Sequence, residues 1–305
     1  MTKKMVFPLI VLALFTSLLL RPCVGVCQES PDMKEGMKYF YEKEYDKAAE
    51  FFHNESKRDP NNTLGLLFLL DCYAQKKNVQ PVMNELEEAS LNNPQSAIIK
   101  SNLGMGYFAQ SLLKRDSSSD EALNAFQEAL KLDANLAQAY VGMGIIYYKK
   151  RMIPRSRSYF SKALKLNGDD AVALERLGEI FLIDDKNAGA AQSQFSRIME
   201  LYPTYPDGYF YYASACKELG ETDRALEYYE KTLALDPKGM GKGYYAPVRI
   251  GDIYYDTMKN NAKAIEYYEK ALKINPDNSY AKRMLNLVKN PPKTEGEGPD
   301  KKKKK

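Results

Sequence analysis

Apolar residues in this chain recur at the spacing of α-helices, and no stretch shows the sustained alternation of a β-strand. Six segments share one pattern, in which a small residue precedes a phenylalanine or tyrosine by four positions on the same helical face. The small residue lets a neighbouring helix approach closely, and the ring fills the space beside it. The pairs are Ala48 and Phe52, Ala122 and Phe126, Ser156 and Phe160, Ala191 and Phe195, Ala225 and Tyr229, and Ala264 and Tyr268.

A second amphipathic segment precedes these helices, and it places a glycine or alanine at one fixed position. Glycine inside a helix costs about 1 kcal/mol relative to alanine, so its recurrence predicts a close helix crossing. Proline or glycine then ends most of the pairs of helices, because proline cannot continue the helical hydrogen bonds. The recurring small positions of the first helices are Gly104, Gly144, Gly178, Ala213 and Gly251.

The helix pairs repeat with a period of 34 residues, which separates Pro60 from Pro94 and Pro203 from Pro237. A period of this length is typical of stacked helix pairs, each of which covers the apolar face of the pair before it. The pattern resembles that of the tetratricopeptide repeat family over roughly residues 29 to 290. This resemblance implies an all-α fold, a right-handed α-solenoid of about seven antiparallel helix pairs with a C-terminal capping helix.

The expected repeat units differ in length. Six extra residues precede Ala122, residues 238–243 lengthen the approach to the last unit, and single insertions fall near Asn187 and Asn260. Because insertions in repeat arrays map to loops, we expect a loop at each of these places and an intact stack. The expected units are residues 29–62, 63–96, 97–136, 137–170, 171–205, 206–239 and 244–278, and the capping helix is 279–290.

Residues 1–27 are predicted to be an export signal. Two lysines precede a largely apolar run from Val6 to Leu20, and small residues follow at Gly25 and Cys27. The run is shorter than the roughly 20 residues that cross a bilayer, so cleavage after Gly25 or Cys27 is favoured. The alternative is lipid attachment at Cys23 or Cys27, as in bacterial lipoproteins. We therefore expect an exported protein, periplasmic or secreted, that is held at a membrane only if it is lipidated.

Charge argues against a nucleic-acid partner. The formal net charge of +4 falls to about +1 without the signal, and the lysine-rich tail, residues 291–305, holds the remaining excess. The repeat body is therefore slightly acidic, whereas a surface that follows a phosphate backbone needs a basic excess. The tail has no apolar residue and is expected to be disordered.

Residues suited to catalysis are scarce. The single histidine, His53, is expected at the surface, and Cys72 and Cys216 lie four units apart, too far for a disulfide. Residues 239–243 contain three glycines and a lysine but lack the spacing and the following hydroxyl residue of a phosphate-binding loop. We interpret them as a flexible linker. The sequence therefore predicts no cofactor, no metal site and no enzymatic activity.

The resemblance to tetratricopeptide repeats implies a concave groove, lined by the first helix of each unit, that holds an extended peptide or a partner's helix. Aromatic and arginine side chains at the groove-facing phase have the composition of a protein interaction site. For each aromatic residue, a place in the seam between units stays open as the alternative. The candidate partner-binding residues are Phe68, Phe108, Tyr148, Arg176, Phe210, Tyr211, Arg249 and Tyr255.

These features favour a non-enzymatic scaffold of the cell envelope that binds another protein in an aromatic-lined groove. The alternative is carbohydrate or envelope-polymer binding, in which the same rings stack on sugars as part of a secretion or polysaccharide export assembly. The composition of the groove phase does not identify the partner.

Overall fold

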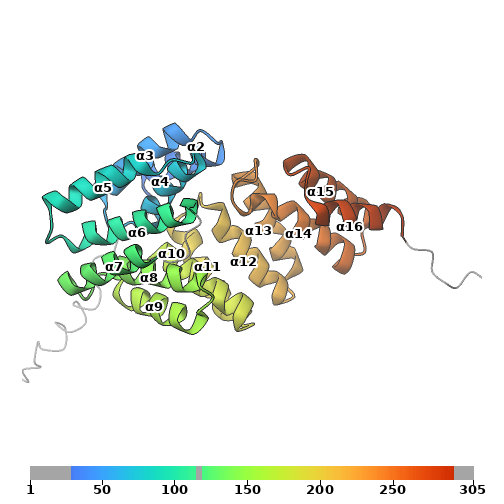
Figure 1. The fold of residues 1–305 in the computed structure, drawn as a ribbon. Helices are drawn as coiled ribbons and strands as arrows, with labels where there is room; N and C mark the ends of the chain where they lie inside the picture. The colour runs from blue at the N-terminus through green and yellow to red at the C-terminus, as the bar shows by residue number, and fades with distance from the viewer. Residues whose placement is uncertain (1–28, 115–118, 292–305) are drawn as a thin grey trace, which may run out of the picture.

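The computed structural model describes residues 29–114 and 119–291, which form a succession of helices with no β-strand among them (Figure 1). This confirms the all-α solenoid. The expected signal, with Cys23 and Cys27, and residues 292–305 of the expected tail lie outside the described residues. None of the described helices is both long enough and apolar enough to cross a lipid bilayer.

The helices pair in chain order, and we number the pairs as units 1 to 7. Two short π-helical turns, η1 (Ile180–Asp184) and η3 (Ile253–Thr257), extend the first helices of units 5 and 7, and the 3-10 turn η2 (Lys242–Tyr244) precedes unit 7. The pairs are α2 (Pro31–Tyr41) with α3 (Tyr45–Arg58), α4 (Thr63–Gln75) with α5 (Gln80–Asn92), α6 (Ala97–Lys114) with α7 (Asp120–Leu132), α8 (Ala137–Lys149) with α9 (Ile153–Leu166), α10 (Ala171–Glu179) with α11 (Ala188–Leu201), α12 (Pro206–Glu218) with α13 (Thr222–Leu235), and α14 (Ala246–Asp252) with α15 (Asn261–Ile274).

The recurring rings form the core of the stack. All six predicted rings, from Phe52 to Tyr268, are almost completely buried. The recurring glycine of the first helix lies directly against the ring of its own unit, since a Cβ added at Gly144 would be 2.6 Å from Phe160 Cε1. Gly104, Gly178 and Gly251 are placed in the same way against Phe126, Phe195 and Tyr268. The glycine position therefore marks the helix crossing, as its recurrence predicted.

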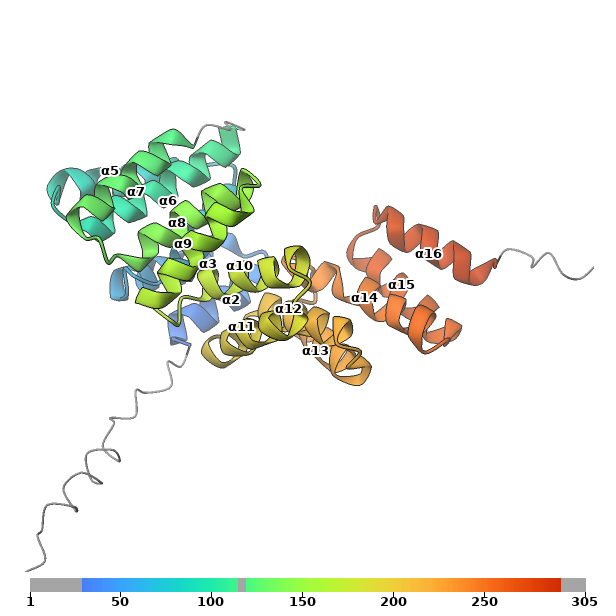
Figure 2. The ribbon, with the colours of Figure 1, turned by 90° about the horizontal axis from the view of Figure 1, so that it is seen from below.

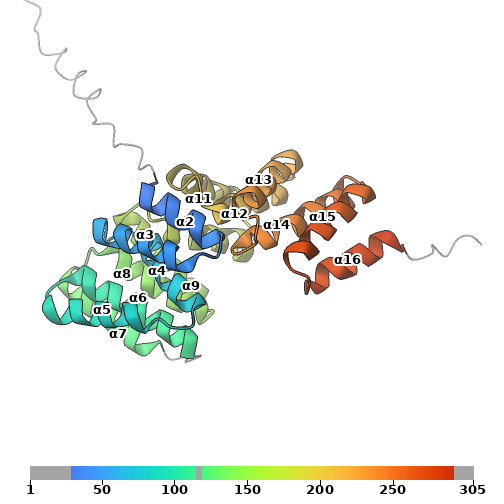
Figure 3. The same cartoon turned by 90° about the horizontal axis from the view of Figure 1, so that it is seen from above.

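Helix α16 (Ser279–Lys289) covers the last unit, as expected of a capping helix. Asn278 starts it by accepting a hydrogen bond from the Ala281 amide at 2.9 Å. Met284 and Val288 are buried against the core of unit 7 around Tyr268, and the opposite face of the helix carries lysine and arginine. Figures 2 and 3 show α14, α15 and α16 extending away from the more compact body that the first five units form.

The single insertions near Asn187 and Asn260 are absorbed within helices, which corrects the expectation of loops. In unit 5 the Asp185 amide donates to the Ile180 carbonyl at 3.1 Å, and in unit 7 the Met258 amide donates to the Ile253 carbonyl at 3.0 Å. Each extra residue thus widens the last turn of a first helix into a π-helical turn. Such turns often occur at functional sites.

The inner face of units 2 to 5 is closed. Helix α4 contacts both α6 and α10, and α8 contacts the same two helices, so the four first helices form an inner ring. Thr63 Oγ1 donates to Asp170 Oδ2 at 2.8 Å across the closing contact, and the Phe68 and Tyr205 rings meet edge to face at 5.9 Å. Side chains therefore reduce the groove that an open superhelix would leave to a cavity of about 440 Å³ between α4, α10 and residues 240–245.

Residues 238–245, which we name the clasp loop, fasten the closed arrangement. The buried Asp236 carboxylate accepts hydrogen bonds from the Met240, Gly241 and Gly243 amides at 2.8 to 2.9 Å. The loop also reaches unit 1, where Lys238 Nζ donates to the Glu42 carbonyl at 3.0 Å. This segment is therefore a held loop, and the interpretation of residues 239–243 as a flexible linker was wrong.

Candidate partner-binding cavity

Two of the predicted groove residues belong to the closed part of the fold. Phe68 is buried between Phe40, Phe52 and Tyr205, with ring centroids at 5.0, 5.0 and 5.9 Å. Phe108 on α6 is also buried. Phe68 also lines, together with Arg176, the cavity of about 440 Å³ at the closing contact, whereas Phe108 occupies the seam between units.

Tyr148 on α8 and Arg176 on α10 belong to the helices of the inner ring. Arg176 forms ion pairs with Glu175 at 3.3 Å and Glu179 at 2.5 Å, and its guanidinium carbon is 6.0 Å from the centre of the Tyr148 ring. Two carboxylates thus compensate the charge of Arg176. This arginine therefore stabilises the fold and has little charge left for a partner.

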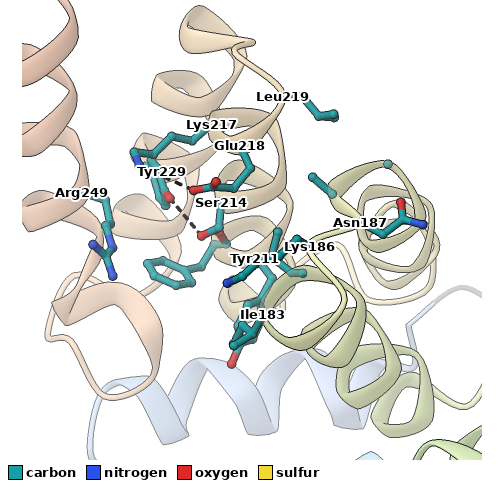
Figure 4. A pocket seen from close by; sticks show the side chains of 14 residues that line it. Ile183, Lys186, Asn187, Tyr211, Ser214, Lys217, Glu218, Leu219, Tyr229 and Arg249 are labelled. Atoms are coloured by element: carbon teal, nitrogen blue, oxygen red, sulfur yellow. Dashed lines mark hydrogen bonds and ion pairs between the residues drawn. The ribbon is translucent and has the colours of Figure 1, made fainter.

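The predicted residues Phe210, Tyr211 and Arg249 lie together in one cavity of about 790 Å³ (Figure 4). The cavity opens between the end of unit 5 and the first helices of units 6 and 7. The lining residues are Leu182, Ile183, Lys186, Asn187, Ala188, Gly189, Phe210, Tyr211, Ser214, Lys217, Glu218, Leu219, Tyr229 and Arg249. Tyr255, by contrast, is half-buried beside the Tyr268 cluster of unit 7 and does not line this cavity.

The floor of the cavity is held rigidly from behind. The Tyr211 ring stacks on Phe195 at 5.2 Å, and its hydroxyl donates to the Glu179 carboxylate. Ser214 Oγ and the Tyr229 hydroxyl share a hydrogen bond of 2.9 Å. Burial raises the pKa of Tyr229 to about 12, so this hydroxyl keeps its proton at neutral pH. A partner would therefore meet a floor that is already ordered.

The rim of the cavity carries two exposed apolar side chains that the sequence reasoning missed. Ile183 in η1 is 51% exposed, and Leu219 at the end of α12 is 45% exposed. Met258, just after η3 in unit 7, is also exposed. These residues stand at different distances from the recurring glycine or alanine, so the repeat pattern gives no signal for this rim.

The polar part of the lining has an excess of positive charge. Lys186 lies in the turn after η1, Lys217 on α12 and Arg249 on α14, and Glu218 is the one acid that lines the cavity. Lys217 Nζ is 3.7 Å from Glu218 Oε1, and Arg249 Nη1 is 3.6 Å from Asp252 Oδ2. Both contacts are longer than a hydrogen bond. The cavity therefore combines apolar surface with weakly compensated cations.

Residues with catalytic potential lie apart from the cavity. Cys72 and Cys216 are buried and unpaired, as expected, and burial raises the pKa of the Cys72 thiol to about 12. His53 is half-exposed, with Nδ1 at 3.7 Å from Glu85 Oε2. Within residues 29–114 and 119–291, no group of three or more histidine, cysteine, aspartate or glutamate side chains is placed to hold a metal ion.

Known protein families match the described units. Profiles described as tetratricopeptide repeat match residues 141–206, 206–238 and 248–278, and one described as TPR repeat matches residues 118–150. The chain belongs to the tetratricopeptide repeat (TPR) family. Its units 3 to 7 contain the matched segments, and these units include the whole cavity.

Relatives of this TPR protein are longer chains. It is 24% identical over 229 residues to the TPR repeat-containing protein MJ1428 of Methanocaldococcus jannaschii, a match that covers 70% of this chain and 38% of the relative. It is 26% identical over 213 residues to anaphase-promoting complex subunit 3 of Schizosaccharomyces pombe, covering 67% and 30%. The chain thus spans less than two fifths of either relative.

Solved structures of TPR proteins share the architecture. YrrB, described as a TPR protein with an unusual peptide-binding site, is 26% identical, with a TM-score of 0.51 over 66% of this chain and 98% of YrrB. A chain of the Cut9–Hcn1 assembly is 17% identical, with a TM-score of 0.59 over 91% of this chain and 52% of that one. The second likeness concerns the fold alone.

Proposed function

We propose that this TPR protein is a non-enzymatic scaffold that binds a peptide segment or helix of another protein in the cavity of units 5 to 7. The observation that carries the proposal is the cavity of about 790 Å³ that joins an ordered aromatic floor to two exposed apolar rim residues. The peptide-binding site named in the description of YrrB supports the same use of the fold.

Binding would be driven by burial of apolar surface. Removing apolar surface from water is favourable by about 25 cal/mol for each square ångström, and the freedom that both partners lose on association offsets part of this gain. Ile183 and Leu219 supply such surface at the rim, and the Phe210 and Tyr211 rings, which are already nearly buried, form the floor beneath it. Because the floor is fixed by stacking and hydrogen bonds, little conformational entropy is lost when a partner binds.

The proposed location is the cell envelope. It is based on the lysines, the apolar run and the small residues within residues 1–27. Mass determination of the mature protein from its native cell tests the location, because an N-terminus after Gly25 or Cys27, or a lipid on Cys23 or Cys27, is expected. An intact first residue in the mature protein would contradict export.

Site-specific photo-crosslinking in the native cell tests partner binding. A photoreactive residue at position 219 is expected to form a discrete protein adduct that mass spectrometry identifies. The matched control replaces Leu91, which is 81% exposed on α5 and does not line the cavity. Exchanging Ile183 for serine in the position-219 protein should remove the adduct, since it removes apolar rim surface without disturbing the buried floor.

The outcomes separate the proposal from its alternative. Equal adducts at positions 219 and 91, or none at either, would contradict the cavity as the binding site. A carbohydrate partner would instead appear as binding of purified envelope glycan in the absence of any protein.

A further inference from the structure

We propose that the partner segment carries an aspartate or glutamate beside its apolar anchor, and that Arg249, with Lys186, binds this acid. The inference rests on the proposed function and adds the chemistry of the partner to it. It concerns an acidic side chain of a peptide, held at the open end of the array by cations on two walls of the cavity.

Arg249 is distinguished by comparison with Arg176, which occupies the same position two residues before the recurring glycine of its helix. Arg176 is neutralised by two glutamates. Among the described residues Arg249 forms an ion pair only with Asp252, at 3.6 Å. The other carboxylate oxygen of Asp252 already accepts hydrogen bonds from Tyr268 at 2.9 Å and Tyr280 at 3.0 Å. The Arg249 side chain is 47% exposed. Its five guanidinium donors are therefore available to a ligand.

Lys186 provides a second cation across the cavity. It is exposed in the turn that follows η1, and it has no ion pair with any residue of 29–114 or 119–291. In Figure 4 Lys186 lies beside Tyr211, and Arg249 projects from the helix on the opposite side of the cavity. The excess of positive charge is local to the cavity, because the repeat body as a whole is slightly acidic. A carboxylate beside the Arg249 guanidinium would form charge-assisted hydrogen bonds, the stronger class in proteins, and Lys186 adds positive charge to the same cavity.

The apolar rim determines which kind of anion fits. Ile183 and Leu219 flank the cations and need apolar partners, so a ligand that presents charge alone would leave this surface exposed to water. Nucleic acid is excluded by the same reasoning, since it needs a continuous basic stripe. A peptide with an aromatic or aliphatic anchor next to an acid satisfies both parts of the lining.

Selection from a phage-displayed library of random twelve-residue peptides on the mature protein tests the inference. Aspartate or glutamate is expected to be enriched next to an aromatic or aliphatic residue. The most enriched peptide is then synthesised with its acid and with the matching amide, and both are titrated by fluorescence anisotropy. We expect the amide peptide to bind about tenfold more weakly, the effect of one charge-assisted hydrogen bond.

Variants of the protein locate the effect. Arg249→Gln should weaken the acidic peptide about tenfold and leave the affinity for the amide peptide unchanged. Lys273→Gln makes the same change of charge on the exposed side of α15, outside the cavity, and should alter neither affinity. Circular dichroism checks that both variants keep the helical fold.

The possible results distinguish failure of the acid inference from failure of the scaffold proposal. Three results would overturn the acid inference and leave the scaffold proposal standing. They are selected peptides that show no preference for an acid, equal affinity for the acid and amide peptides, and an Arg249→Gln variant that binds both peptides as the parent protein does. Failure to select any peptide whose binding Ile183→Ser weakens would overturn the scaffold proposal and the acid inference with it.

Discussion

At the scale of single residues, Gly142 is a point where the stack tolerates no side chain. A Cβ at this position would lie 2.1 Å from Phe126 Cζ and 2.4 Å from Phe126 Cε1, and the Phe126 ring is fully buried. We expect Gly142→Ala to lower the free energy of unfolding by about 1–3 kcal/mol, the usual cost of overpacking a core. Urea denaturation followed by circular dichroism measures this change.

Gly189→Ala is the matched control. Gly189 lies in α11, and the nearest atom to its added Cβ is Asn187 Oδ1 at 3.9 Å. Alanine there should raise the free energy of unfolding by up to about 1 kcal/mol, because alanine favours the helix more than glycine does. A higher free energy of unfolding for both variants would show that the Phe126 ring can move aside, which would contradict our interpretation of the helix crossing.

The sequence predicts such residues only where they recur. Gly104, Gly144, Gly178 and Gly251 stand at one repeated position, and their role follows from the period. Gly142 stands instead at the position that Arg176 and Arg249 occupy in later units, so its contact with Phe126 became visible only in the structure. The same limit applies to the site. Phe68 and Tyr211 share one helical phase, yet one closes the inner ring and the other lines the cavity.

At the scale of elements, the two π-helical turns show that unit length reveals an inserted residue but not where the structure accommodates it. The length of units 5 and 7 revealed one extra residue in each, and the known behaviour of repeats placed both in loops. The structure places them in the last turn of a first helix, where the amide and carbonyl groups stay paired. In unit 5 that turn presents Leu182 and Ile183 to the cavity and positions Lys186 and Asn187 after them.

Deleting Asp184 from η1 is therefore expected to separate binding from folding. The shortened turn can close as an ordinary α-helical turn, which rotates the residues after it by about 100° and moves Lys186 and Asn187 away from the cavity. Far-ultraviolet circular dichroism should show unchanged helix content, and anisotropy titration should show loss of peptide binding.

Deletion of Asp256 from η3 is the matched control for Asp184. It shortens the equivalent turn of unit 7. Because no residue of that turn lines the cavity, peptide binding should persist. Equal binding by both deletion variants would show that the wide turn of unit 5 has no part in the site.

At the scale of the whole molecule, closure of the inner ring divides the array into a sealed part and an open part. A groove along all seven units was the expectation from the repeat pattern, but α4 meets α10 and the clasp loop joins units 6 and 7 to unit 1. Closure depends on the sum of small rotations between successive units, and no single unit's sequence reveals that sum. A cavity of about 440 Å³ therefore remains at the closing contact, and the larger cavity of about 790 Å³ lies where units 5 to 7 diverge from the ring.

Carboxylates concentrated at this closing contact should make the closed arrangement sensitive to pH. Asp207 faces Glu175 on α10, Asp236 after α13, Lys242 in the clasp loop and the Tyr41 and Tyr205 rings. Burial, followed by repulsion from Glu175, raises the pKa of Asp207 to about 7, and burial also raises the pKa of Asp170 and Glu175. Closing the ring therefore favours the protonated form of these groups.

The sign of the effect follows from linkage. A carboxyl group whose pKa is raised in the folded form contributes its full stability below its unfolded pKa of about 4 and loses it as the pH rises through the folded value. We expect the free energy of unfolding, measured by urea denaturation, to fall between pH 5 and pH 7.5. The free energy of unfolding of the Asp207→Asn variant should fall less steeply over this range. Asp223→Asn, at an exposed position of α13, should show the same pH dependence as the parent protein. A free energy of unfolding that rises over this range, or an Asp207→Asn variant with the parent's slope, would show that the ionised carboxylates are accommodated without cost at the closing contact.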